Sequence, residues 1–342
     1  MNTYDLVLEN GKVFTDNGYF DSVAIDSGKI AKVADRIDES AKRKIDLNGK
    51  YVLPAFIDAH VHMIFTGLQK TRIDMNGAKS REEAVSLVFD ANKDNGRKAI
   101  IGYGWDESKW TDRRFLSADD FNRIDRPVVL YRKDLHSAVI NVKAMRISGI
   151  ESGDGMVREE DLKKIEPITE PDNQERNMAM QYAFNEAIAK GVCAVRDVVG
   201  KNESMHYRST RYPVIVREML YSDSLYEGYG SERSEGTIKA FLDGSVGSMT
   251  AAHKGWDPEN LKMGRNKFLS FSRRFWESGY PISVHAIGEI ATEIAASVFS
   301  LYHGELRNSV EHFEFVDDAV LGAMDKRIVI SSQPNFLQWS LP

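Results

Sequence analysis

From Pro54 onward, the chain alternates between apolar runs of strand length and runs typical of helices. A strand that alternates with a helix predicts a parallel β-sheet covered by helices, which places this part of the chain in the α/β class. The expected strands are Phe56–Val61, Val192–Val198, Val214–Leu220, Thr237–Leu242, Pro281–His285, Ser309–His312 and Arg327–Ser332. The expected helices between them include Lys267–Ser278, Glu289–Tyr302 and Asp317–Asp325.

The first 55 residues differ from the rest because short β-runs follow one another with turns between them. Tyr4–Glu9 alternates apolar and polar residues, and the pair Asn10-Gly11 directly after it is a turn signal. A second Asn-Gly pair stands at Asn48-Gly49 between two further β-runs. We therefore expect part of a small β-sandwich domain over residues 1–55 and a second domain over residues 56–342.

A long insertion, at about residues 65–190, separates the first two strands of the second domain. It contains strands of its own, expected at Ala99–Tyr103 and Pro127–Tyr131, and helices, expected at Arg81–Asp94 and Asn173–Ala189. The insertion is therefore an α+β segment that interrupts the regular alternation of strand and helix.

The composition excludes several classes of protein. The chain has a net charge of −6, whereas a nucleic-acid binder usually presents a basic face. Cys193 is the one cysteine, which excludes an intrachain disulfide framework and a cysteine-rich zinc site. No apolar run approaches the roughly 18 residues of a membrane span, and the first residues lack the features of a signal peptide. We expect a cytoplasmic enzyme for a small-molecule substrate, without nucleic-acid or membrane partners and with a homo-oligomer left open.

Two histidines, His60 and His62, stand at the end of the first strand of the second domain. Residues i and i+2 of a strand point to the same side, so both imidazoles can reach one metal ion. Imidazole suits zinc and other late divalent metals. The alternative is a chance His-x-His on a surface turn, and the apolar strand around the pair argues against it.

The stretch Pro54–His62 resembles the amidohydrolase superfamily of metal-dependent hydrolases. The similarity continues through Ile238–Ser245, Val284–Glu289 and Val310–His312, which resemble the fourth, fifth and sixth barrel strands of that superfamily. Together these motifs are similar to the branch that contains YtcJ and N-substituted formamide deformylase. The resemblance extends from about Tyr4 to the last residue.

The resemblance implies a (β/α)₈ TIM barrel beside a small β-sandwich, with the active site at the C-terminal ends of the barrel strands. It implies that His60 and His62 bind the more buried metal and that His285 and His312 hold a second one. Lys239, carboxylated by CO₂, would bridge the two metals. The expected cofactor is therefore two divalent ions, most naturally Zn²⁺, with a single metal and an unmodified lysine as the alternative.

The chemistry of lysine favours the carboxylated form of Lys239 over the unmodified one. An ammonium group has no lone pair and cannot bind a metal, whereas a carbamate is anionic and offers two oxygens. Lys239 lies between Ile238 and a further apolar run, where a charged lysine needs a partner.

For His285, the alternative to metal binding is a satisfied core histidine. Near His312, we expect Glu311 or Glu314 to orient a metal ligand.

Three residues of the insertion match segments of the family, and the resemblance implies that they contact the substrate. Trp105 would form a wall of the pocket, and His136 and Asn141 would line it. Each has a structural alternative: a buried tryptophan in the first case, and helix capping and packing in the other two.

One departure from the family concerns the eighth barrel strand, which carries an aspartate that binds metal and shuttles the proton. Seven candidate strands are present, and Pro342 follows soon after the seventh. We therefore expect a barrel truncated after the seventh strand, with the catalytic residue unassigned. We expect a polypeptide of this extent to be inactive and prone to aggregation through its unpaired strand edges.

These observations predict a metal-dependent hydrolase of amide-type C–N bonds other than peptide bonds, acting through a metal-activated water. A first alternative is a single-metal deaminase of an amino-heterocycle, which would use a glutamate soon after the fifth-strand histidine, here Glu289. A second alternative is a relative without catalytic activity.

Overall fold

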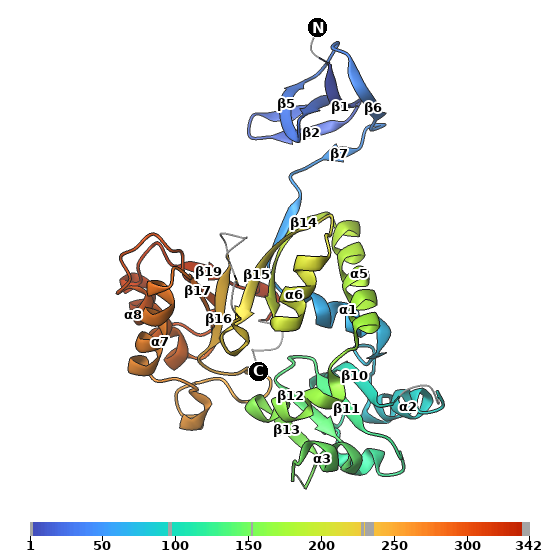
Figure 1. The fold of residues 1–342 in the computed structure, drawn as a ribbon, viewed down its shortest axis with the longest axis vertical. Helices are drawn as coiled ribbons and strands as arrows, with labels where there is room; N and C mark the ends of the chain where they lie inside the picture. Colours follow the sequence, from blue (N-terminus) through green and yellow to red (C-terminus); the bar gives the residue numbers. More distant parts are fainter. Residues whose placement is uncertain (1–2, 95–97, 152, 227–228, 230–235, 337–342) are drawn as a thin grey trace. The chain divides into compact units, whose positions relative to one another are not determined.

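The computed structural model describes residues 3–94, 98–151, 153–226, 229 and 236–336 (Figure 1). The chain divides into two compact units, Met1–Ile57 and Asp58–Pro342. The second unit contains every candidate site residue.

The first unit consists of two small sheets. One has the strand order β5-β4-β1-β6 and the other the order β3-β2-β7. The strands are β1 Tyr4–Glu9, β2 Lys12–Thr15, β3 Gly18–Phe20, β4 Ser22–Asp26, β5 Lys29–Ala34, β6 Ala41–Asp46 and β7 Tyr51–Val52. Val7, Ala24 and Ile37 form a small buried core.

The two Asn-Gly pairs do not close simple hairpins, which differs from the turns expected between neighbouring strands. β1 pairs with β4 and β6, whereas β2 pairs with β3 and β7, so the chain changes sheet at Asn10-Gly11. The second pair, Asn48-Gly49, lies beside the first, because the Gly49 N–H donates to the carbonyl of Asn10 at 2.7 Å. The left-handed φ of 58° at Asn10 and 49° at Asn48 provides the change of direction. The chain therefore passes from the first sheet to the second at each Asn-Gly pair, and the two crossings lie side by side.

The second unit is built on a seven-stranded sheet with the order β19-β18-β17-β16-β15-β14-β8. All pairs from β14 to β19 are parallel. The strands are β8 Phe56–Val61, β14 Val192–Val199, β15 Ile215–Tyr221, β16 Thr237–Phe241, β17 Ile282–Ala286, β18 Ser309–His312 and β19 Val329–Ser331. Every residue of β17 and β18 is buried, as expected for a parallel sheet covered on its faces. The predicted α/β class is confirmed.

The sheet is strongly curved, because strands that lie far apart in its order come into contact. His60 on β8 and Glu311 on β18 are joined by a hydrogen bond of 2.6 Å. In the order of the sheet, however, the four strands β14 to β17 lie between β8 and β18. Arg196 on β14 also reaches the Ser309 hydroxyl of β18, at 3.0 Å. The sheet therefore bends toward a barrel, which brings the ends of its strands together.

Helices cover the outside of this sheet (Figure 1). α5 and α6 pack against β14, and α7 and α8 pack against β17. The helices of this part are α1 Met63–Thr71, α5 Asn173–Ala189, α6 Lys201–Ser209, α7 Arg265–Glu277, α8 Glu289–Phe299 and α9 Asp318–Ala323. Their apolar faces and the strands form one large core that includes Phe184, Phe268 and Phe299.

The insertion forms a second sheet with the order β13-β12-β11-β10-β9. Its elements are β9 Ile73–Asp74, α2 Arg81–Ala91, β10 Ile100–Trp105, β11 Val128–Arg132, β12 Ser137–Ile140, α3 Val142–Ser148, β13 Met156–Arg158 and α4 Glu166–Thr169. The strands β9 to β11 are parallel and β11 to β13 antiparallel. Trp105, Trp110 and Phe121 belong to a core that the insertion forms with its own residues.

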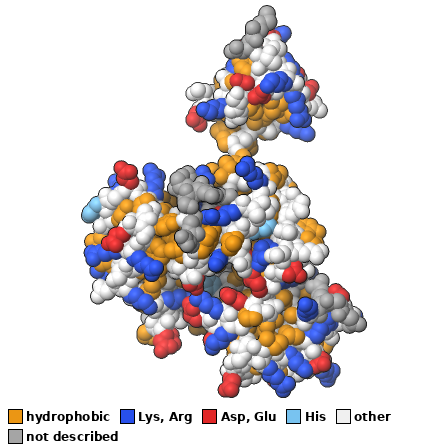
Figure 2. Space-filling model, viewed as in Figure 1, with side chains coloured by type: hydrophobic (Ala, Val, Ile, Leu, Met, Phe, Trp, Pro, Cys, Tyr) orange, Lys and Arg blue, Asp and Glu red, His pale blue; other side chains and the backbone are white. Residues whose placement is uncertain are grey.

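The surface carries no large area of one charge on the face that Figure 2 shows, where positive and negative side chains are interspersed. Within the described residues, no helix combines the length and the apolar character needed to cross a membrane.

Helix α1 places the end of β8, because it starts one residue after His62. It packs very closely against α5: a methyl group at Gly67 would lie 1.8 Å from the carbonyl oxygen of Ala179. No side chain larger than hydrogen fits this contact. Gly67 therefore sets the distance between α1 and α5.

We predict that Gly67→Ala lowers the free energy of unfolding by about 1–3 kcal/mol or more, because the backbones of α1 and α5 must separate. The matched control is Gly322→Ala in α9, where a methyl group meets no atom within 4 Å. The control should be neutral or slightly stabilising, because alanine favours helices over glycine. Urea unfolding followed by tryptophan fluorescence measures both. Equal midpoints for the two variants would contradict the close contact.

Candidate active site

Four imidazoles gather at one edge of the curved sheet. His60 lies on β8 and His62 directly after it, while His285 and His312 lie on the neighbouring strands β17 and β18. The ring centroids of His60 and His312 are 4.7 Å apart, and those of His285 and His312 are 4.5 Å apart. His62 lies 5.6 Å from His60. The structure therefore brings together the four histidines expected to bind metal.

Lys239, on β16, is almost completely buried, with 1% of its surface exposed. Its Nζ has no hydrogen-bond partner among the described residues. It lies 5.2 Å from the ring centroid of Phe241. Burial, assisted by the charge of Arg196, lowers the pKa of this amine to about 8, although the charge of Glu311 opposes the change. A buried amine with a reduced pKa is neutral for part of the time at neutral pH.

In three of the four histidines, one ring nitrogen donates a hydrogen bond to a fixed oxygen. His60 Nδ1 donates to the Glu311 carboxylate at 2.6 Å, and His312 Nδ1 donates to Gln333 Oε1 at 2.7 Å. His285 Nε2 donates to the carbonyl of Gly244 at 2.9 Å. A proton fixed on one nitrogen leaves the lone pair on the other, which is the arrangement that orients histidines in metal sites.

All four imidazoles are held in the neutral form. Burial lowers the pKa of each ring, and the neighbouring imidazoles add to this effect at His62, His285 and His312. For His60, burial and then the charge of Lys239 outweigh the hydrogen bond with Glu311. Neutral imidazole is the form that binds a metal ion.

Glu311 is the acceptor at the centre of this group and is fully buried. Besides His60, its carboxylate accepts from the hydroxyls of Ser283 at 2.6 Å and Ser309 at 2.7 Å. Burial alone would raise its pKa, but the hydrogen bond with His60 and the charges of Lys239 and Arg196 together hold it far below its usual value. Glu311 is therefore the charged acceptor that orients His60.

The backbone at the end of β18 is unusual. His312 has a φ of 73° and Phe313 a φ of 50°, both in the left-handed region that residues with a side chain rarely adopt. The reversal directs the Phe313 N–H to the carbonyl of Ala286, at 3.0 Å. The end of β18 is thereby joined to the end of β17 beside the imidazoles.

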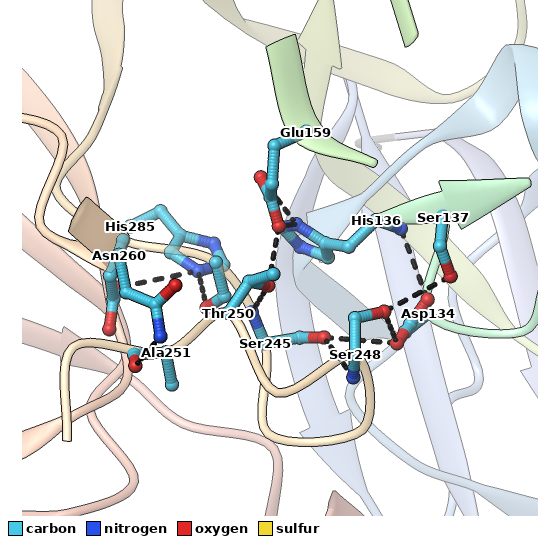
Figure 3. Close-up of polar contacts among 12 residues, drawn as sticks. Asp134, His136, Ser137, Glu159, Ser245, Ser248, Thr250, Ala251, Asn260 and His285 are labelled. Atoms are coloured by element: carbon cyan, nitrogen blue, oxygen red, sulfur yellow. Dashed lines mark hydrogen bonds and ion pairs between the residues drawn. The ribbon is translucent and has the colours of Figure 1, made fainter. Parts of the chain in front are cut away.

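The insertion contributes a polar cluster that reaches the site (Figure 3). His136 lies with its ring centroid 5.2 Å from that of His285, and its Nδ1 contacts the Glu159 carboxylate at 3.2 Å. Glu159 also accepts from Thr250 at 2.5 Å and from Lys262 at 2.6 Å. The cluster therefore connects the insertion to the loop that follows β16.

A second carboxylate of the insertion makes similar contacts in Figure 3. Asp134 accepts from the hydroxyls of Ser245 at 2.9 Å and Ser248 at 2.6 Å. Arg132 contacts the same carboxylate at 2.8 Å. These bonds hold the glycine-rich loop after β16 against the insertion.

Of the three residues expected to contact the substrate, the structure places only His136 beside the histidines. Trp105 has no exposed surface, and its Nε1 donates to the carbonyl of Leu130 within the core of the insertion. Asn141 caps α3, because its side chain accepts from the Ala144 N–H at 3.1 Å. These are the positions expected if Trp105 is a buried structural tryptophan and Asn141 is a helix cap.

Several contacts of the site were not anticipated from the sequence. Glu159 stands in the acidic run Glu159-Glu160-Asp161, which gives no local sign of which carboxylate is buried. The carbonyl of Gly244 is a backbone group and carries no side-chain signal. Gln333 lies just after β19, in a segment for which the sequence predicts no role.

A curved parallel sheet with functional side chains at the ends of its strands is typical of α/β-barrel enzymes. A model of the amidohydrolase family matches residues 43–337. This range covers most of the chain, which therefore belongs to the amidohydrolase family, in the branch similar to YtcJ.

Two relatives match nearly the whole chain. Protein LONG AFTER FAR-RED 3 of Arabidopsis thaliana is 26% identical over an alignment of 402 positions, gaps included. The alignment covers 97% of this chain and 68% of that protein. The putative amidohydrolase YtcJ of Bacillus subtilis (strain 168) is 23% identical over 380 residues, which cover 94% of this chain and 70% of that protein.

The crystal structure of an uncharacterized metal-dependent hydrolase from Pyrococcus furiosus is similar to this chain with a TM-score of 0.71 and 27% identity. The match covers 98% of this chain and 78% of that chain. It confirms the expected TIM-barrel-like α/β fold.

The surroundings of Glu159 generate a prediction on stability against pH. Burial would raise its pKa, but its contacts with His136 and Lys262 lower it to about 2. The ordinary pKa of about 4.5 applies to the unfolded chain, so the stabilisation is complete above pH 4.5 and is lost as the pH falls toward 2. We expect Glu159→Gln to lower the free energy of unfolding at pH 7 by on the order of 2–3 kcal/mol.

Urea unfolding at pH 7, 4 and 3 measures this effect. The difference between wild type and Glu159→Gln should shrink as the pH falls below about 4.5. The matched control is Glu160→Gln, at a neighbouring carboxylate whose side chain is 70% exposed. This control should stay within about 0.5 kcal/mol of wild type at each pH. A difference for Glu159→Gln that does not depend on pH would show that its charge is not what stabilises the cluster.

Proposed function

We propose that this chain is a metal-dependent hydrolase of C–N bonds other than peptide bonds, with a small-molecule substrate. The observation that carries the proposal is the group of four neutral imidazoles at the ends of parallel strands, three of them oriented by a fixed acceptor. The amidohydrolase family of the chain supports C–N hydrolysis. The metal-dependent hydrolase from Pyrococcus furiosus supports a divalent ion.

Three observations bear on whether these residues fit a metal ion. Among the described parts of the chain, no group of three or more His, Cys, Asp or Glu side chains already has the arrangement of a metal site. Two other observations support the fit. His62 Nδ1 and Lys239 Nζ are buried and have no hydrogen-bond partner within the part of the chain that the structure describes. The other three imidazoles are oriented by acceptors. A buried polar atom without a partner costs free energy, which a bound ion would recover.

Under this proposal, His60 and His62 hold one ion, and His285 and His312 hold a second. A zinc ion suits these nitrogen donors. When bound, a divalent metal lowers the pKa of a water molecule toward neutrality and polarises a substrate carbonyl. Glu311, Gly244 and Gln333 each bind the proton of one ring nitrogen, so the other nitrogen of His60, His285 and His312 would be the donor to a metal.

Lys239 is proposed to carry a carboxylate, whose two oxygens would serve as donors to the metal ions. Its burial and the lack of a hydrogen-bond partner among the described residues support this assignment, because carboxylation converts an unsatisfied amine into an anionic group with two oxygens. A neutral amine is also the form that reacts with CO₂, and the reduced pKa provides it.

His136 is proposed to contact the substrate. Its ring lies beside His285, and Glu159 fixes its Nδ1 proton, so Nε2 is left available to a bound molecule. We assign no residue to the transfer of the proton to the leaving group.

The structure does not favour the single-metal deaminase. That reading gives a catalytic role to Glu289, but this carboxylate lies at the start of α8 and accepts from His253 Nδ1. It also accepts from the Lys254 N–H at 3.3 Å. Within the described residues, the hydrogen bonds of Glu289 therefore go to His253 and Lys254.

The first test joins metal content to turnover. Protein purified without chelator should contain zinc or another divalent metal and should hydrolyse members of a panel of N-acyl and formamide substrates. His60→Ala combined with His62→Ala should remove most of the metal, because three or four protein ligands set the affinity. The control is His206→Ala, since His206 contacts Tyr212 far from any proposed ligand in the sequence. Equal metal in wild type and the double variant would refute the assignment.

The second test concerns the bridge. Reconstitution with metal should improve when bicarbonate is supplied, and Lys239→Arg should lose the second metal, because a guanidinium stays charged and cannot be carboxylated. Elemental analysis should give close to two metals per wild-type chain and about one for the variant. Two metals per chain in Lys239→Arg would exclude the carboxylated bridge.

A further inference from the structure

His62 differs from the other three histidines in the way it is held. Glu311, Gly244 and Gln333 each accept a hydrogen bond from one of those rings. The Nδ1 atom of His62 is buried and has no partner among the described residues. No acceptor of the described chain therefore fixes this ring through Nδ1, and its position must come from elsewhere.

The backbone next to His62 is fixed instead. His62 is the N-cap residue of α1, and the first N–H of that helix belongs to Met63. The Met63 N–H donates to Asp197 Oδ1 at 2.8 Å. Asp197 is fully buried on β14, the strand next to β8, and its Oδ2 accepts from the Tyr207 hydroxyl at 2.6 Å.

This bond satisfies one of the N–H groups at the start of a helix. The first four N–H groups of a helix have no partner within it and need an acceptor from outside the helix. The imidazole of His62 makes no such bond, and the first turn of α1 contains no acidic residue. Asp197 supplies an acceptor for the Met63 N–H from a neighbouring strand.

We propose that Asp197 is a positioning residue of the metal site, which sets the place of the His62 imidazole by holding the N–H of Met63. This inference rests on the proposed metal-binding function. Asp197 acts on His62 through the backbone, as Glu311 and Gln333 act on their histidines through a ring nitrogen.

Four variants distinguish the loss of the acceptor for the Met63 N–H from a general loss of stability. Asp197→Leu removes the acceptor and keeps the number and branching of the side-chain heavy atoms, whereas Asp197→Asn retains an oxygen for the Met63 N–H. Tyr207→Phe removes the other hydrogen bond of Asp197 and leaves its bond to Met63. Val88→Ala, in the core of the insertion, provides a destabilised protein whose defect lies in another cluster.

Zinc affinity is measured by competition with a chromophoric chelator, and the thermal unfolding of each metal-free variant is recorded. We expect Asp197→Leu to bind its most weakly held zinc about 10- to 100-fold less tightly, the usual effect of losing a group that orients a ligand. Asp197→Asn, Tyr207→Phe and Val88→Ala should bind zinc like the wild type. Wild-type affinity in Asp197→Leu would overturn the proposal, as would an equal loss in Val88→Ala at equal thermal stability.

A second measurement does not require Asp197→Leu to fold. In metal-free wild type labelled with ¹⁵N-methionine, the Met63 amide is identified by its absence in Met63→Leu. Its exchange with deuterium should be slow, and its signal should shift in Asp197→Asn. Exchange as fast as that of an exposed loop would overturn the inference, even if Asp197→Leu were insoluble.

The outcomes also distinguish this inference from the proposed function. Wild-type protein that binds no zinc would refute the metal site, while the exchange of Met63 would still report on the bond to Asp197. Zinc binding of equal affinity in the wild type and in Asp197→Leu would refute the positioning role alone.

Discussion

The buried carboxylate of Glu311 is the group on which both the curvature of the sheet and the order of the site depend. It contacts His60 on β8, Ser283 on β17 and Ser309 on its own strand, and Arg196 on β14 lies 3.4 Å away. A buried charge is tolerated only when its hydrogen-bonding capacity is filled, and removing one partner is strongly destabilising. The strands that supply these partners must therefore meet, which keeps the two sides of the sheet in contact at the point where the imidazoles gather.

The insertion is connected to the site by the same kind of chemistry. Asp134 and Glu159 bind the loop after β16 through hydroxyl groups and Lys262, and Glu159 also fixes the ring of His136. Because Gly244 belongs to this loop and accepts from His285, a change in the insertion can alter the orientation of a proposed metal ligand. The insertion is therefore joined to the candidate site by direct hydrogen bonds and belongs to its structure.

The strands of the second unit were predictable because each is a short apolar run that a parallel sheet buries on both faces. β17 was expected at Pro281–His285 and lies at Ile282–Ala286. The change of sheet at Asn10-Gly11 was not predictable, because an Asn-Gly pair has the same local signal whether the strands stay together or separate. The choice depends on contacts such as the bond from Gly49 to Asn10, which joins residues remote in the sequence.

The candidate ligands could be named from motifs, whereas the groups that orient them could not. A His-x-His pair on a strand predicts its own geometry, because the side chains alternate. The acceptor of His285 is a backbone carbonyl, and the anchor next to His62 is Asp197, 135 positions further along the chain by residue number. Such partners are set by the packing of whole elements and leave no pattern within a local stretch of sequence.

The left-handed backbone at His312 and Phe313 has a consequence for the choice of residue at position 312. Residues with side chains lose on the order of 1–3 kcal/mol each in such conformations, and glycine would relieve the cost. A glycine at 312 would also delete an imidazole from the site. The backbone conformation at position 312 therefore favours glycine, whereas the proposed site requires an imidazole there, so the fold and the site have opposite requirements at this residue.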